Sequence, residues 1–444
     1  MLLLLRIIVL FLIIFNFRMP LIRYSASWAI ALCTLIYLFQ WKKIPLKYFF
    51  KRYSAYILLF LIGLCTYAYL FPIQRFTFDF GILDSFIVQL FLLLSILYVS
   101  PYIIGEGRDS AFNKVSEVII LTFALQAIIH LASFFNEGFG EFISGLKPES
   151  LREIVDVEGQ GFRVFSLTGN PYFALPAGYG VAFILFFRLL LTSYSSWLFS
   201  GFKRYILFFI LVAGAVLSGR TGFTGLFCAS VMALLMNYRG NTLKIIQIAK
   251  SSVITVLLLG LIVFTSSAIL SSQQLKAIEK DVFPFAFEFL YNYDKSGEFS
   301  TLSTDYLTEN MYFNIPEETF FLGDARYSET SGGYYKSTDA GYMRQILFGG
   351  VIYLLILIVY QLLYFYTPMK TALERRFSDG WNDFLCWLTL LVYLFILNYK
   401  GEAIGTMQIM QCLFLLLGLT YLTENEYLRH CKTDYSRSTK QETI

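Results

Sequence analysis

The chain has 444 residues, of which 57% are hydrophobic, 18% aromatic and 15% charged, and its formal net charge is +4. Soluble domains average about 25% charged and about 45–50% apolar residues, so this composition excludes an ordinary soluble enzyme or binding domain. The net charge is too small to indicate a partner by itself. Apolar residues come in long runs, such as 254–264 and 351–360. The sequence therefore predicts an all-α integral membrane protein, built as a single polytopic membrane domain over 1–444.

Twelve apolar segments are expected to cross the membrane as helices. The first has no basic region ahead of its apolar core and no small-residue cleavage site, so we expect a retained span and not a signal peptide. The first, seventh and eighth segments are short, and one of them is a candidate re-entrant or half-span. The twelve segments are 2–17, 21–40, 53–71, 81–100, 115–135, 171–191, 204–218, 221–238, 251–270, 345–366, 381–399 and 402–422.

Lysine and arginine gather in alternate connections between these segments, and this pattern orients the chain. Because basic residues favour the cytoplasmic side, both termini are expected there, with a cytoplasmic tail over 423–444. Two longer connections, 136–170 and 271–344, then become periplasmic loops, and both are net acidic. An arginine in either of these acidic loops is therefore a candidate functional residue. The basic connections are 42–52, 105–114, the one that holds Lys203 and Arg204, 239–250 and 369–380.

Sequence motifs for the common cofactors are absent. There is no P-loop, no GxGxxG after a strand, no HExxH and no Cys/His cluster, so neither a cofactor nor a metal is expected. No DxD pair appears, which disfavours a metal-held nucleotide sugar. The two histidines, His130 and His430, lie in an apolar run and in the tail.

The first candidate site is the turn AVLSGRTGFTGL (215–226), where Arg220 lies between two apolar segments. A charged side chain costs about 2.5–3.5 kcal/mol deep in a bilayer and less near the interface. The flanking glycines allow a ligand or another backbone to approach closely. A guanidinium in this position suits bidentate capture of a phosphate. The alternative is an arginine that snorkels to the interface between packed helices.

The second candidate is GFRVFSLTGNPYFALP (161–176), which ends the first periplasmic loop and enters the next segment. Asn170 and Pro171 are typical of a loop that stops where a helix starts. Arg163 is then expected just above the membrane. The alternative is an ordinary loop arginine paired with one of the acidic residues upstream.

The third candidate is FFLGDARYSETSGGYYKSTDAGYMRQILFGG (320–350), a glycine-rich polar stretch that runs directly into an apolar segment. Asp339 and Tyr342 share a face if the helix has begun, and Arg344 is expected in its first turn. The alternative is a polar loop with Thr338 or Asp339 as the helix N-cap. Two arginines and two carboxylates in this stretch favour a site, with Asp324, Arg326 and Tyr327 as its other members.

All these residues are expected on one side of the membrane at one level. Arginines there fit the phosphate or diphosphate head group of a lipid-linked substrate, and an aspartate suits a general base for a sugar hydroxyl. We expect Asp339, and after it Asp324, as the base. The predicted catalytic residues are Asp339, Asp324 and Arg220, and the predicted substrate-binding residues are Arg163, Arg220, Arg326, Tyr327, Tyr342 and Arg344.

The passages FRVFSLTGNP, LSGRTG and FLGDARY…GGYYKSTDAGYMRQILFGG resemble those of the bacterial O-antigen polymerase family. LSGRTG departs from the family pattern in lacking an extra serine before the arginine. The resemblance implies a GT-C-like fold of about twelve transmembrane helices in the bacterial inner membrane. It also implies a glycosyltransferase that polymerises polyprenyl-diphosphate-linked oligosaccharide repeat units into O-antigen or a related surface polysaccharide, without a metal or a nucleotide sugar. A chain-length regulator and a flippase are its candidate protein partners, and no nucleic acid is expected.

Two other functions stay open. The O-antigen ligases resemble the same family but are associated with a histidine in the late periplasmic loop, and 271–344 contains none. A flippase or transporter of lipid-linked oligosaccharides is expected to carry charges within its spans, along a path across the membrane. The middles of the predicted spans here are nearly free of charge.

Overall fold

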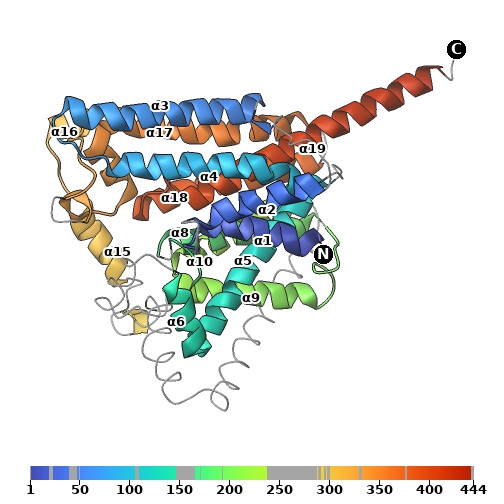
Figure 1. Cartoon of the computed structure of the whole chain (residues 1–444), viewed down its shortest axis with the longest axis horizontal. Helices are drawn as coiled ribbons and strands as arrows, with labels where there is room; N and C mark the ends of the chain where they lie inside the picture. Colours follow the sequence, from blue (N-terminus) through green and yellow to red (C-terminus); the bar gives the residue numbers. More distant parts are fainter. Residues whose placement is uncertain are drawn as a thin grey trace.

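In the part of the chain that it describes, the computed structural model consists of helices joined by turns and loops, with two isolated β-bridges (Figure 1). Within the described residues, six helices, α3, α4, α5, α8, α17 and α18, are long and apolar enough to cross a membrane, and α1, α2 and α10 are shorter apolar helices. This confirms an all-α protein with helices suited to a membrane. The residues described are 2–19, 24–39, 48–49, 51–105, 110–146, 166–170, 172–192, 194–237, 288, 292–294, 297, 301–329, 333–375 and 378–441.

The helices follow the apolar segments of the sequence closely. Each predicted segment within the described residues coincides with a helix, and segment 251–270 lies outside those residues. The helices are α1 (Leu2–Phe15), α2 (Ser25–Phe39), α3 (Arg52–Gln74), α4 (Gly81–Ile104), α5 (Ala111–Phe135), α6 (Glu137–Gly145), α8 (Ala174–Leu191), α9 (Lys203–Ser218), α10 (Thr221–Asn237), α15 (Leu302–Tyr306), η4 (Leu307–Met311), α16 (Glu317–Leu322), η5 (Tyr335–Ser337), α17 (Gly341–Glu374), α18 (Ser378–Lys400) and α19 (Gln408–Gln441).

The last predicted segment, 402–422, differs from the structure at both ends. Residues 401–407 are mostly buried but not helical, and α19 continues through the predicted tail to Gln441. The non-helical passage is stabilised because the Asn398 side chain accepts hydrogen bonds from the backbone N–H groups of Ala403 and Ile404, both at 2.9 Å. Buried backbone groups need such partners wherever a helix is interrupted at membrane depth.

Helix α8 lies at the centre of the bundle, in contact with α5, α9, α10, α18 and α19. Apart from Arg188 in its last turn it is apolar on all sides, as expected of a helix that is buried all round. Its Gly180 packs against Gly225 of α10 so closely that a Cβ at position 225 would lie 2.1 Å from the Gly180 Cα. The glycines that follow Arg220 therefore have a packing role, because small residues let membrane helices approach.

One end of the bundle is tied together by buried charges. Arg188 near the end of α8 donates to Asp383 of α18 at 2.6 Å and to Asn113 of α5 at 2.7 Å. Arg375, just after α17, donates to the same aspartate at 3.1 Å. These groups lie near helix ends and not at helix centres, so they do not form a charged path through the bundle.

The late polar loop gathers at the other end. Figure 1 shows α15 and α16 at one end of α3 and α17, whereas the last part of α19 projects beyond the opposite end. Helix α16 packs against α17. The structure thus places the third candidate stretch, 320–350, where a polar end and long apolar helices meet.

Candidate functional site

The candidate site is built on a break in α17. Gly349 and Gly350 leave helical geometry, with φ −131° and ψ 15° at the first and φ 72° at the second. The loop inserts two backbone N–H groups at this break: Asp324 N donates to Leu347 O at 2.7 Å and Ala325 N donates to Phe348 O at 2.9 Å. The break therefore fixes the GDARY turn against the helix, because each freed carbonyl regains a donor.

The other side of the turn is held by the connection between α3 and α4. Asp79 accepts hydrogen bonds from the backbone N–H groups of Tyr327 at 2.7 Å and Ser328 at 2.6 Å. Thr77 donates its hydroxyl to Ala325 O at 2.7 Å. Asp79 was not among the predicted site residues, since a lone aspartate in a short connection gives no signal of its partners. Its role is to position the turn.

Arg344 lies in the first turn of α17, as predicted, and its guanidinium is sandwiched between two tyrosines. The guanidinium carbon is 4.0 Å from the ring centroids of both Tyr327 and Tyr334. Its Nη1 lies 3.3 Å from Oε2 of Glu402, which also accepts a hydrogen bond from the Tyr327 hydroxyl at 2.7 Å. Burial is the main cause that raises the pKa of Tyr327, and the nearby Glu402 carboxylate is the second. The Tyr327 hydroxyl therefore stays protonated and donates its hydrogen bond to Glu402.

The Arg344 side chain keeps unused hydrogen-bonding capacity. It is 7% exposed, and its Nε and Nη2 have no hydrogen-bond partner within the described residues. The same holds for Oε1 of Glu402. Buried polar atoms are nearly always paired in native structures, so unpaired N–H groups on a fixed guanidinium point to a ligand. Planar N–H groups of this kind match the oxygens of a phosphate.

Asp339 precedes α17 and is half-buried. Removal of its carboxyl from water raises its pKa, while the charges of Arg344 and Lys400 act in the opposite direction. The helix begins at Gly341 with Ala340 as its N-cap, so the alternative of an N-cap at Thr338 or Asp339 is wrong. A raised pKa close to a basic group is the environment of a general base.

Asp324 has a different environment. It accepts hydrogen bonds from the hydroxyls of Thr319 at 2.7 Å and Tyr335 at 3.1 Å, and the Nζ atom of Lys336 lies 3.4 Å from its Oδ2. Both carboxylate oxygens are thus occupied by the loop itself. Between the two aspartates predicted as the base, the geometry favours Asp339.

Arg326 and Tyr342, two further predicted binding residues, contact other neighbours. The Arg326 guanidinium carbon is 6.0 Å from the centroid of the Tyr335 ring. The Tyr342 hydroxyl donates to Phe395 O of α18 at 3.0 Å, which ties the start of α17 to its neighbour.

Arg220 contacts a different part of the late loop. It lies between α9 and α10, where it forms an ion pair with Glu288 and donates to the Ser303 hydroxyl at 3.1 Å. Its side chain is 15% exposed. Arg326 and Arg344 thus both contact tyrosines within 327–335, whereas the contacts of Arg220 are with residues 288 and 303.

Arg163 lies outside the described residues, but the end of its passage is described. Gly169 N donates to Phe15 O of α1 at 2.8 Å, and the hydroxyl of Thr168 donates to the same carbonyl at 3.2 Å. A Cβ at Gly169 would lie 2.6 Å from Asn16 O. The SLTGNP sequence therefore docks the end of the loop onto α1.

Sequence reasoning missed Glu402 and Tyr334, the two partners of Arg344 outside the GDARY turn. The sequence prediction placed Glu402 at the start of an apolar span. The signal that could have found it is its position as a lone carboxylate between two apolar spans. Tyr334 was one of several tyrosines in the loop and carried no signal of its own. Within the residues that the structure describes, no group of three His, Cys, Asp or Glu side chains is placed to hold a metal ion.

Comparison with protein-family models, curated proteins and solved structures found no match to this chain.

Proposed function

We propose that the chain is a glycosyltransferase that polymerises polyprenyl-diphosphate-linked oligosaccharide repeat units into O-antigen or a related surface polysaccharide. The observation that carries the proposal is the buried, tyrosine-stacked Arg344, whose Nε and Nη2 are unpaired beside Asp339. It lies at the end of a long apolar helix, where a lipid anchor and a sugar chain separate. The sequence resemblance stated above supplies the reaction class.

The chemistry assigns one role to each group. Asp339, as a carboxylate, accepts the proton of a hydroxyl on the incoming lipid-linked unit, and that oxygen forms a bond to the anomeric carbon of the growing chain. The bond from this carbon to the diphosphate oxygen breaks, and polyprenyl diphosphate leaves with the electron pair. Arg344 and Arg220 stabilise the negative charge that develops on the leaving group, together with Arg163 and Arg326.

The membrane setting belongs to the same proposal. Twelve spans in a GT-C-like arrangement, with both termini in the cytoplasm, place the late loop on the periplasmic side of the inner membrane. The six long apolar helices and the position of α16 at one end of α17 support this arrangement. Cysteine-labelling at residues near α16 and near the end of α19 tests it, because the two ends are expected to be accessible from opposite sides.

The test of the activity is reconstitution. The purified full-length chain, given a polyprenyl-diphosphate oligosaccharide, is expected to produce a ladder of polymers on a gel. Failure with every such substrate contradicts the proposal. If polymer transfer to a lipid A-type acceptor occurs without ladder formation, the chain is a ligase. If loss of the protein in cells traps single lipid-linked units on the cytoplasmic side, the chain is a flippase.

A further inference from the structure

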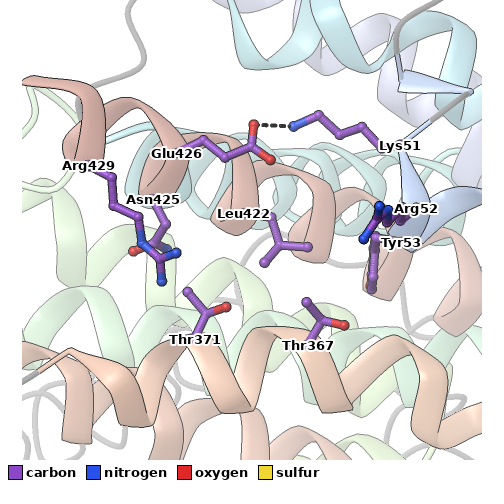
Figure 2. A pocket seen from close by; sticks show the side chains of 9 residues that line it. All are labelled: Lys51, Arg52, Tyr53, Thr367, Thr371, Leu422, Asn425, Glu426 and Arg429. Atoms are coloured by element: carbon purple, nitrogen blue, oxygen red, sulfur yellow. Dashed lines mark hydrogen bonds and ion pairs between the residues drawn. The ribbon is translucent and has the colours of Figure 1, made fainter.

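A second polar site lies at the other end of α17, about 35 Å from Arg344 along the helix. It is a cavity of about 410 Å³ between the start of α3, the last turns of α17 and the middle of α19. Figure 2 shows Arg429 and Arg52 on opposite sides of it, with both threonines projecting from α17 between them. The lining residues are Lys51, Arg52, Tyr53, Thr367, Thr371, Leu422, Asn425, Glu426 and Arg429.

The lining is basic. It contains three cationic side chains and one carboxylate. Lys51 Nζ pairs with Glu426 at 2.8 Å, and Arg429 pairs with Glu374, outside the cavity, at 2.8 Å. Arg52 is exposed, and no ion pair engages it within the described residues. The cavity thus contains the guanidinium of Arg52, which no carboxylate holds within the described residues, and two cations, Lys51 and Arg429, that carboxylates hold in place.

Neutral donors complete the lining. Thr367 and Thr371 are four residues apart on α17, so their hydroxyls lie on one face of the helix. Asn425 of α19 lies on the same face as Arg429, with its amide nitrogen donating to Tyr421 O of its own helix at 2.7 Å. Arginine, lysine and hydroxyl groups around a small cavity match the oxygens of a phosphate group. The volume suits a head group of moderate size.

The outer surface of α3 next to the cavity carries exposed apolar side chains. Below Arg52, the side chains of Tyr56, Leu59 and Ile62 follow at intervals of four, three and three residues and are 60%, 65% and 48% exposed. An exposed apolar stripe on a helix of this length and hydropathy faces acyl chains. An anionic phospholipid would fit this arrangement, with its phosphate in the cavity and its acyl chains along the stripe.

We propose that this cavity binds the phosphate head group of an anionic membrane lipid, with Arg52 as its principal contact. Basic pockets between membrane helices on the cytoplasmic side are suited to such head groups. The site lies at the opposite end of α17 from the candidate polymerase site and does not depend on that function.

Native mass spectrometry of the purified full-length chain tests this site. Dioleoyl phosphatidylglycerol is the lipid probe, dioleoyl phosphatidylcholine its neutral counterpart and glycerol 3-phosphate the soluble phosphate. We expect one tightly held phosphatidylglycerol and weaker phosphatidylcholine binding. Arg52→Gln is expected to weaken phosphatidylglycerol binding about fivefold, the effect of one basic contact at a membrane surface. Thr371→Val is expected to weaken it without a change of charge.

Arg75→Gln is the matched control, because Arg75 lies just past the other end of the same helix and near Glu318. It is expected to bind phosphatidylglycerol as the native chain does. Thermal unfolding of each variant verifies that it is folded. Equal binding of the two lipids, or equal effects of Arg52→Gln and Arg75→Gln, overturns the site. Glycerol 3-phosphate that binds as tightly as phosphatidylglycerol overturns its assignment to a lipid.

Discussion

Arg344 at the start of α17 and Glu402 between α18 and α19 form a buried ion pair, with Nη1 and Oε2 3.3 Å apart and the side chains 7% and 6% exposed. The pair joins two residues far apart in sequence at one end of the bundle. Each keeps unpaired atoms within the described residues: Nε and Nη2 on the arginine, and Oε1 on the glutamate. The pair fixes the guanidinium while its Nε and Nη2 stay buried without a partner within the described residues, which suits a binding group better than a purely structural one.

Substitutions of Arg344 are therefore expected to affect stability and the proposed activity in separable ways. Arg344→Gln leaves Glu402 as an unpaired buried charge, which is expected to cost about 3–5 kcal/mol and to abolish polymer formation. Arg344→Lys keeps the charge but loses the planar fork, so we expect a better folded chain with at least about tenfold less polymer. Thermal unfolding in detergent and the gel ladder measure the two effects.

The double variant Arg344→Gln with Glu402→Gln removes both charges and serves as the control. It is expected to recover most of the stability lost in Arg344→Gln, because no buried charge is left unpaired. It is expected to remain inactive. A double variant that polymerises at the native rate contradicts the binding role of Arg344.

The two aspartates are expected to respond differently to substitution by asparagine. Asp339→Asn removes the proposed base and is expected to abolish polymerisation with little change in unfolding temperature. Asp324→Asn weakens the contacts with Tyr335 and Lys336, so we expect a loss of about 1–3 kcal/mol in stability and retained activity at low temperature. If the Asp339→Asn variant is active, Asp339 is not the base.

The raised pKa of Asp339 predicts the pH dependence of the rate. A base acts as the carboxylate, so the rate falls when acidification protonates it. Because the pKa of Asp339 lies above that of an ordinary aspartate, the rate is expected to fall at a higher pH than it would with an ordinary aspartate as the base. The Lys400 charge lowers the pKa, so Lys400→Gln is expected to shift the acid limb to still higher pH. Rate–pH profiles of the two proteins measure this shift, and an unmoved limb contradicts the assignment.

The break in α17 is expected to require glycine at position 350. A Cβ there would lie 2.1 Å from Phe321 O at a backbone φ of 72°. Gly350→Ala is therefore expected to cost about 1–3 kcal/mol and to release the GDARY turn from α17, with loss of polymer. Gly63→Ala in α3 is the control, since nothing lies within 4 Å of a Cβ there. Limited proteolysis of the late loop and thermal unfolding distinguish the two variants.

Arg220 is expected to be required for long-chain polysaccharide. Arg220→Ala is expected to abolish it while the protein still inserts into the membrane, because the side chain is proposed to contact the diphosphate. Glu288→Gln removes the charge of its ion-pair partner and keeps the arginine, so polymer formation is expected to persist. Chain-length distribution on a gel, with protein abundance in the membrane, measures the result. Unchanged chain length in Arg220→Ala contradicts the diphosphate site.

The sequence predicted the helices well because long apolar runs are a local property. The positions of α3, α5, α8 and α18 follow directly from them, and so does the entry of Arg344 into the first turn of α17. The helix boundaries near residues 401–407 did not follow, because the side chain of Asn398 provides hydrogen bonds that no local pattern reveals.

The sequence by itself determined an all-α chain with membrane-suited helices and a polar, arginine-bearing stretch next to one of them. Tertiary structure decided how that stretch is used. It paired Arg344 with Glu402, stacked it between Tyr327 and Tyr334, and engaged Asp324 within the loop while leaving Asp339 half-buried. Hydropathy and helix periodicity act over a few turns. Pairing between distant side chains depends on how helices pack and where a helix such as α17 breaks.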